Sequence, residues 1–145
     1  MKAYTALCSG LFFPLHERLK GHDSVAWHKR LEASQWWSAE QLAEQQIRRL
    51  REFLQRIGRD VPYYRDLFQA AGFDAREVRS TDDLRALPLL GKPEIRANLE
   101  RLQAAGHGPL TRYNTGGSSG EPLIFFMGKE RKSHDVAAKW RATRW

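Results

Sequence analysis

The 145-residue sequence has one cysteine and no long apolar run, and each absence excludes a class of protein. Cys8 alone can form neither an intramolecular disulfide nor a thiolate zinc cluster, which favours a reducing compartment. No stretch approaches the roughly 18 to 20 apolar residues of a membrane span, and no signal-peptide cleavage site follows the N-terminal apolar residues. We therefore expect a cytoplasmic protein without a transmembrane segment. Peripheral contact with a membrane surface, through the apolar residues Leu11, Phe12 and Phe13, stays an open alternative.

Repeats, low-complexity segments and metal-ligand spacings are also absent from the sequence. Eleven Gly and six Pro are too few for a collagen-like or low-complexity chain. Hydrophobic residues make up 41% and charged residues 28%, which is typical of about one soluble globular domain. No metal site is predicted, because the N-terminal histidines fit neither the i, i+4 spacing of a helical site nor a zinc finger. These histidines are His16, His22 and His28.

The net charge is positive, with 24 Lys and Arg against 17 Asp and Glu. The C-terminal residues 129–145 alone hold six basic and two acidic side chains. A basic tail of this kind can bind nucleic acid. However, acidic residues are interspersed elsewhere and no established DNA- or RNA-binding motif is present, so we expect no nucleic-acid partner.

Hydrophobic periodicity predicts helices from residue 38 onwards, after an irregular segment over residues 1–37. Ser38 and Gln41 have the spacing of a capping box at the start of a long amphipathic helix, and Gly58 is predicted to end it. Pro62 stands in the first turn of the next helix. The predicted helices cover residues 39–57, 62–71 and 93–102.

The pattern then changes to a strand–loop–strand unit over residues 110–127, followed by a helix over 130–145. Leu123 to Met127 is apolar throughout, as in a strand that is covered on both faces. Two strands do not form an independently stable sheet, and the last helix reaches Trp145 without a cap. We therefore expect an α/β fold that is begun here but not completed.

The loop between these strands has the sequence TGGSSGEP and is the main candidate site. Its glycines allow successive backbone N–H groups to point into one concavity, and its hydroxyls add donors, which suits phosphate oxygens. A flexible surface turn has a similar composition, but the flanking strands favour a binding loop. The candidate residues are Thr115, Gly116, Gly117, Ser118, Ser119 and Gly120.

Two phosphate-binding motifs are excluded by spacing, whereas one catalytic motif matches literally. Neither the Walker A pattern nor the dinucleotide pattern G-x-G-x-x-G fits the loop. Gly116–Gly120 does match the G-x-S-x-G nucleophile elbow of serine hydrolases. That elbow must lead directly into a helix and be followed by Asp and then His. Here Pro122 leads into a predicted strand and no His follows Asp135, so a serine hydrolase is the less favoured alternative.

The loop resembles the phosphate-binding loop of adenylate-forming enzymes. It is most similar to that of the phenylacetate–coenzyme A ligase-like family, including its CapK-type branch associated with capsular polysaccharide biosynthesis. Val61–Arg65 (VPYYR) and Leu87–Lys92 (LPLLGK) precede the loop in the same order as in that family. The resemblance covers about residues 38–145. Two positions depart from it: Gly91 stands where Thr is common, and Leu123 where many adenylate-forming enzymes have Lys.

This resemblance implies the N-terminal part of an acyl-CoA synthetase-like large domain, with ATP, Mg²⁺ and coenzyme A as cofactors. A small-molecule carboxylate and ATP would give an acyl-adenylate and pyrophosphate, followed by thioester formation. Residues Thr115–Gly120 would hold the β- and γ-phosphates, and the adenine-binding and catalytic residues would lie beyond Trp145. The alternative is a non-catalytic module that binds phosphate or nucleic acid and uses the basic C-terminal helix.

Overall fold

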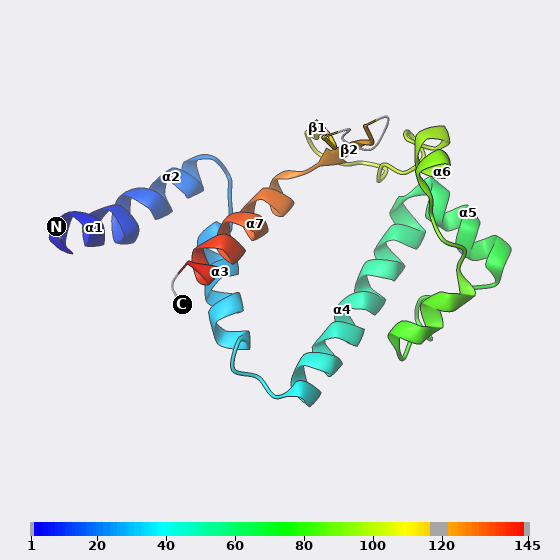
Figure 1. Cartoon of the computed structure of the whole chain (residues 1–145), viewed down its shortest axis with the longest axis horizontal. Helices are drawn as coiled ribbons and strands as arrows, with labels where there is room; N and C mark the ends of the chain where they lie inside the picture. Colours follow the sequence, from blue (N-terminus) through cyan, green and yellow to red (C-terminus); the bar gives the residue numbers. More distant parts are fainter. Residues whose placement is uncertain (1, 117–121, 144–145) are drawn as a thin grey trace. The chain divides into compact units, whose positions relative to one another are not determined.

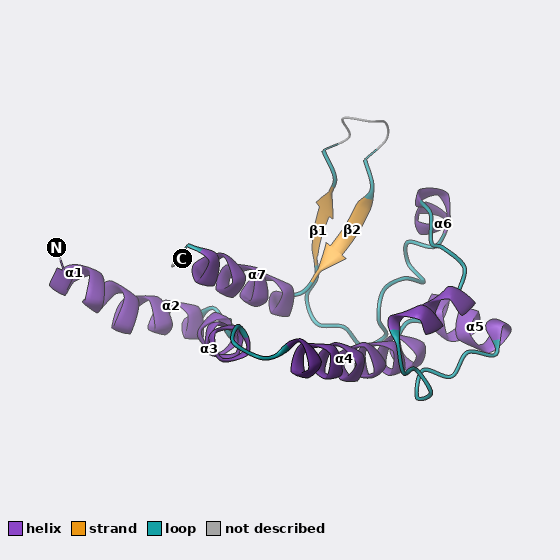
Figure 2. Ribbon diagram, turned by 60° about the horizontal axis from the view of Figure 1, so that its bottom comes forward, coloured by secondary structure: helices purple, strands orange, loops and turns teal. Residues whose placement is uncertain are grey.

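The computed structural model describes residues 2–116 and 122–143, which form helices and one two-stranded sheet (Figures 1 and 2). The chain divides into two compact units. Unit 1 consists of residues 1–37 and 127–145, and unit 2 of residues 38–126. The C-terminal helix thus belongs with the N-terminal segment, whereas the sequence analysis had grouped it with the residues that precede it.

Unit 2 begins with the long helix α4 (Ala39–Asp60), which starts at a capping box. The N–H of Gln41 donates to the Ser38 hydroxyl at 3.3 Å, and the Ser38 N–H donates to the Gln41 side-chain oxygen at 2.9 Å. These two bonds satisfy backbone donors that a helix start otherwise leaves unpaired. The helix extends three residues beyond the predicted range of 39–57.

Gly58 lies inside α4, so the prediction that it ends the helix is wrong. A Cβ at this position would lie 2.8 Å from the ring of Phe68, which is on α5 (Pro62–Ala71). The missing side chain therefore allows the Phe68 ring to pack directly on the α4 backbone. Helix α5 ends at Gly72, whose φ of 61° is the left-handed conformation common after helices.

The core of unit 2 forms where α4, α5 and the following segment meet. Leu54, Phe68, Ala75 and Val78 are buried there. The Arg51 guanidinium donates to the Val78 carbonyl from Nε at 3.1 Å and from Nη2 at 2.9 Å, which fixes the segment to α4. Seven partly buried apolar residues complete the cluster: Leu50, Ile57, Tyr64, Leu67, Phe73, Leu84 and Leu87.

A short 3₁₀ helix, η2 (Thr81–Ala86), follows this core and is also capped. The Asp83 carboxylate accepts the N–H groups of Arg79 at 2.7 Å and Ser80 at 2.9 Å. These backbone hydrogen bonds, first that of Arg79, hold the pKa of Asp83 below its usual value. The carboxylate is therefore charged and capping at neutral pH.

Helix α6 (Lys92–Ala97) is shorter than the predicted range of 93–102. Both the backbone N–H and the side-chain amide of Asn98 donate to the Glu94 carbonyl, at 3.1 and 2.9 Å. The helix ends at Asn98, whose backbone (φ −120°, ψ 23°) has left the helical conformation. Residues 98–102 continue as turns.

The segment after α6 is tied to the corner between α4 and α5. The Tyr63 N–H donates to the Arg101 carbonyl at 3.0 Å, and the Ala105 N–H donates to the Asp60 carbonyl at 2.6 Å. The Arg101 guanidinium donates to the Asp66 carboxylate at 2.8 Å and lies 5.9 Å from the Tyr63 ring centroid. These contacts fix α6 to the helical core.

The predicted strand–loop–strand unit is a β-hairpin of β1 (Thr111–Asn114) and β2 (Ile124–Met127), whose strands run in opposite directions (Figure 2). The rings of Tyr113 and Phe125 stack across the two strands at 5.9 Å. The side chains of β2 are half-buried, so the expected coverage on both faces is partial in this structure.

Unit 1 is helical, and the expectation of an irregular segment over residues 1–37 is wrong. A helical backbone continues through α1 (Lys2–Leu7), the π-helical turn η1 (Cys8–Phe12) and α2 (Phe13–Leu19). Gly and Pro usually interrupt helices, so Gly10 and Pro14 predict a break in any helix here. Gly10 lies within the π turn, and Pro14 lies in the first turn of α2, where proline is tolerated. The π turn also shifts the helix phase, which hides the 3.6-residue periodicity.

The core of unit 1 lies between α3 (Ser24–Ser34) and α7 (Lys129–Ala142). The Trp140 ring stacks on His28 at 4.0 Å and meets Phe13 edge-on at 5.3 Å, so this tryptophan has its partners within the unit. Trp145 and the end of the predicted helix 130–145 lie outside the described residues. Among the described residues, none of the helices is both long and apolar enough to cross a bilayer.

The first prediction concerns the core of unit 2. Phe68→Ala should lower the free energy of unfolding by about 3 to 5 kcal/mol, because it removes a buried ring and leaves a cavity beside Gly58. Leu89→Ala is the control, since Leu89 is 98% exposed and should change stability by less than about 0.5 kcal/mol. Urea unfolding measures the free energy of unfolding of both variants. An equal loss of stability in the two would contradict the packing of Phe68 in the core.

Candidate functional site

The hairpin end and α6 form the candidate site, at the position of the predicted loop. The structure describes Thr115 and Gly116 of that loop, whereas Gly117, Ser118, Ser119 and Gly120 lie outside the described residues. The arrangement of the site is therefore defined by the residues at the base of the loop and by their neighbours.

Thr115 closes the hairpin at the base of the loop. Its N–H donates to the Leu123 carbonyl at 3.0 Å, and its hydroxyl accepts the Leu123 N–H at 2.9 Å. The sequence analysis proposed this hydroxyl as a phosphate donor. In the structure its oxygen already accepts one bond, so any bond to phosphate would use the remaining O–H hydrogen.

Gly116 is open to its surroundings. A Cβ placed there would have no atom of the described residues within 4 Å. No packing contact with the described part of the chain therefore explains a glycine at this position. A backbone that no described side chain covers allows the close approach of a ligand.

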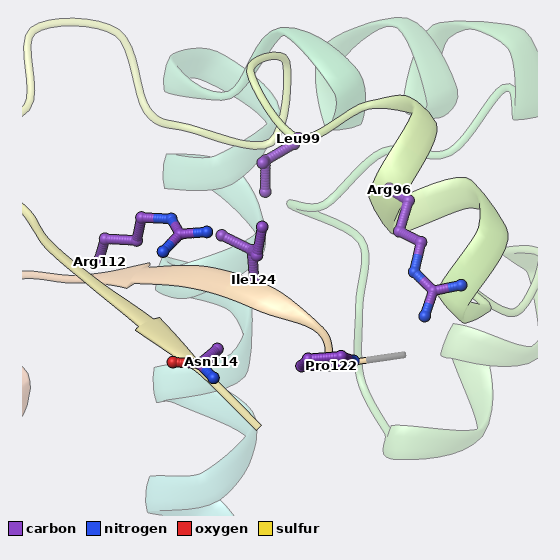
Figure 3. A pocket seen from close by; sticks show the side chains of 6 residues that line it. All are labelled: Arg96, Leu99, Arg112, Asn114, Pro122 and Ile124. Atoms are coloured by element: carbon purple, nitrogen blue, oxygen red, sulfur yellow. The ribbon is translucent and has the colours of Figure 1, made fainter. Parts of the chain in front are cut away.

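A cavity of about 520 Å³ lies beside the hairpin (Figure 3). Arg112 and Asn114 on β1 line one side and Arg96 on α6 the other, with Ile124 between them in this view. Leu99 and Pro122 complete the described lining. Arg112 and Asn114 are two residues apart on a strand, so they share the face that is turned to the cavity.

The described lining of this cavity carries positive charge and no acidic side chain. A guanidinium remains protonated at any physiological pH and presents several donors in one plane. The Arg112 guanidinium and the Asn114 carboxamide therefore favour an anion with several oxygens, such as a phosphate chain or a carboxylate.

A second cavity, of about 330 Å³, adjoins the first and is mostly apolar. The two share Leu99 and Ile124 in their linings. The second is lined mainly by apolar side chains of the α6 region and of the hairpin, such as Leu90, Ile95 and Phe125. Side by side, the two cavities suit a ligand, or a pair of ligands, with an anionic part and an apolar part.

The hydrolase arrangement is not formed by the described residues. Pro122 is followed by strand β2 and not by the helix that a nucleophile elbow requires. Asp135, the acid considered for a triad, accepts from the Arg131 guanidinium at 2.9 Å within α7. Ser118 itself lies outside the described residues.

The basic helix α7 would bind phosphate or nucleic acid in the alternative, non-catalytic function. One side of this helix is buried within unit 1. Ser133 and Ala137 are buried, and the Ser133 hydroxyl accepts the Asp23 N–H at 3.1 Å. Arg131 is paired with Asp135. Within the described residues, no group of three His, Cys, Asp or Glu side chains is placed to hold a metal ion.

Arg96 and Arg112 were missed by the sequence analysis. The alternation of side chains along a strand could have placed Arg112 beside Asn114, had the strand been read residue by residue. Arg96 carries no comparable signal, because only the tertiary contacts of the segment after α6 bring it to the hairpin.

Comparison with known proteins gives a distant relative. No protein-family model matches the chain. The chain is 24% identical over 96 residues, or 66% of its length, to Protein CapK of Staphylococcus aureus. It covers 21% of that protein, so it spans about a fifth of the length of the curated relative that it matches. The chain is therefore distantly related to Protein CapK.

Proposed function

We propose that the chain is the N-terminal part of an ATP-dependent, carboxylate-activating (adenylate-forming) ligase. The observation that carries the proposal is the cavity lined by Arg96 and Arg112 beside the hairpin. In the sequence, Thr115–Gly120 belong to the segment that joins the two strands of this hairpin. The distant relation to Protein CapK supports it, because the resemblance of the loop points to the CapK-type branch.

In this proposal the loop and the cavity bind the polyphosphate of ATP. A carboxylate attacks the α-phosphorus, an acyl-adenylate forms and pyrophosphate leaves, before transfer to coenzyme A. The loop backbone and the Arg112 guanidinium would hold the β- and γ-phosphate oxygens, where negative charge accumulates as pyrophosphate departs. Fixed donors of this kind stabilise the transition state because they are oriented before the reaction begins.

The described cavity residues provide hydrogen-bond donors and few ligands for a cation. Arg96 and Arg112 cannot ligate a metal, and Asn114 supplies one carboxamide oxygen. They do not form a Mg²⁺ site, and in this proposal the ion arrives on the phosphates of ATP. The apolar cavity beside Leu99 is the place that we assign to the apolar part of the carboxylate substrate.

The second prediction tests the loop in the polypeptide encoded by the complete reading frame. Gly117→Val should lower carboxylate-dependent ATP–pyrophosphate exchange by more than about tenfold, because a β-branched side chain blocks positive φ and close phosphate approach. Gly108→Val is the matched control, since a Cβ there meets no described atom within 4 Å. Unchanged exchange in the loop variant would remove the loop from the mechanism, and absence of exchange in the parent would contradict the ligase.

The third prediction separates a phosphate-binding serine from a nucleophile. Ser118→Ala should weaken ATP use by roughly ten- to 150-fold, which corresponds to the loss of one charge-assisted hydrogen bond of about 1.5 to 3 kcal/mol. A covalent nucleophile would instead lose turnover by many orders of magnitude. Stoichiometric labelling of Ser118 by a serine-directed phosphonate would support the hydrolase and refute the ligase.

The fourth prediction tests the cationic cavity in the 145-residue chain. Arg112→Gln should weaken binding of pyrophosphate by about tenfold or more, because it removes a charge-assisted donor. Arg48→Gln, on an exposed position of α4, removes the same charge elsewhere and should leave affinity within about twofold. Isothermal titration calorimetry measures both, and equal losses would show that only net charge matters.

A further inference from the structure

The helical segment over residues 2–19 exposes an apolar face. Six of its large apolar side chains are between 46% and 80% exposed. The six residues are Tyr4, Leu7, Leu11, Phe12, Leu15 and Leu19. Twelve large apolar side chains are exposed among the described residues, so this short segment holds half of them. Such a concentration indicates a surface that meets another apolar phase.

The π turn brings the four leucines of this set towards one side. Leu7, Leu11, Leu15 and Leu19 recur every four residues, and in a regular α-helix each such step drifts by about 40° around the axis. Over three steps the leucines would spread by about 120°. The turn Cys8–Phe12 is wider than an α-helical turn and counters this drift. The result is a narrower apolar stripe than the sequence spacing suggests.

The other side of the segment already packs within unit 1. The Phe13 ring contacts Trp140 at 5.3 Å, and Thr5, Ser9 and Phe13 line a cavity with Val136 and Trp140. The sequence analysis had grouped Phe13 with Leu11 and Phe12 as one candidate membrane contact. In the structure Phe13 is directed to the core of unit 1, whereas Leu11 and Phe12 are exposed.

The exposed side of the segment carries no negative charge. Glu17 is its one acidic residue; it is 6% exposed, accepts a hydrogen bond from the Ser24 hydroxyl and lies 3.4 Å from His22 Nδ1. Burial raises the pKa of Glu17, but the hydrogen bonds from Ser24 and His22 outweigh it and leave the pKa below its usual value. Arg18 and Lys20 are exposed at the C-terminal end of the stripe.

The charge of the whole chain is concentrated in the same unit. Residues 1–37 and 127–145 hold 11 basic and 5 acidic side chains, a net charge of +6. Residues 38–126 hold 13 and 12, a net charge of +1. A second copy of unit 1 would be repelled by this charge, whereas an anionic surface would be attracted.

We propose that residues 2–19 dock unit 1 on a bilayer that contains anionic lipids. The apolar stripe enters the boundary between headgroups and acyl chains, as amphipathic helices do when they lie in the interface. Arg18 and Lys20 meet the lipid phosphates at its end, and the remaining positive charge of the unit adds long-range attraction. This inference is independent of the reaction proposed for unit 2.

The fifth prediction tests this docking by co-sedimentation of the 145-residue chain with vesicles. The chain should bind vesicles of phosphatidylcholine and phosphatidylglycerol much more tightly than vesicles of phosphatidylcholine alone. The double variant Leu11→Gln and Phe12→Gln should weaken binding by roughly tenfold or more. Arg18→Gln should weaken it by about fivefold, and less so in high salt. Leu89→Gln, a substitution at a leucine of unit 2 that is 98% exposed, is the control and should bind as the parent does.

Several outcomes would overturn the proposal. One is absence of binding to the anionic vesicles, and another is equal binding to both kinds of vesicle. Equal loss in Leu89→Gln would show that the effect is not specific to residues 2–19. Sedimentation velocity without lipid tests whether the chain dimerises instead. A dimer that the double variant abolishes would show that the apolar stripe binds a second copy of the chain and not a membrane. Circular dichroism verifies folding, and Leu15→Gln replaces the double variant if that one unfolds.

Discussion

The candidate site depends on how the segment after α6 is held against the α4–α5 corner. The hairpin has only two strands and cannot form a stable sheet by itself. The backbone bonds of Tyr63 with Arg101 and of Ala105 with Asp60 supply a fixed support, and the Arg101–Asp66 ion pair adds a side-chain contact. Through this segment the buried Phe68 cluster positions Arg96 on one side of the cavity and the hairpin on the other. An exposed ion pair contributes little by itself, so the backbone bonds and the core carry most of this support.

The sequence predicted the elements whose signals are local. The capping box at Ser38 and the strand–loop–strand order around Thr115 are both present in the structure. The errors arise where tertiary packing overrides a local rule. Gly58 stays inside α4, where the Phe68 ring packs against the backbone that its missing side chain leaves bare. In residues 1–37 the π turn shifts the helix phase, so a periodic pattern was not recognisable.

The two units differ in their chemistry. Unit 2 is nearly neutral, and within it the Arg112 guanidinium lines a cavity that adjoins an apolar one. Unit 1 carries nearly all of the net charge and the apolar stripe of residues 2–19. A binding site for a small anion needs a few oriented donors, whereas attraction to an extended anionic surface needs many charges spread over a face. The distribution of charge along the chain matches this difference.

The central claim is that the hairpin end, and not the basic helix α7, binds the phosphate chain. Titration of the ¹⁵N-labelled chain with pyrophosphate, followed by amide and arginine Nε chemical shifts, tests it most directly. We expect saturable shifts at Arg112, Asn114 and Gly116, with residues 129–142 unaffected. Shifts confined to residues 129–142, or no saturable shift at the hairpin, would contradict it.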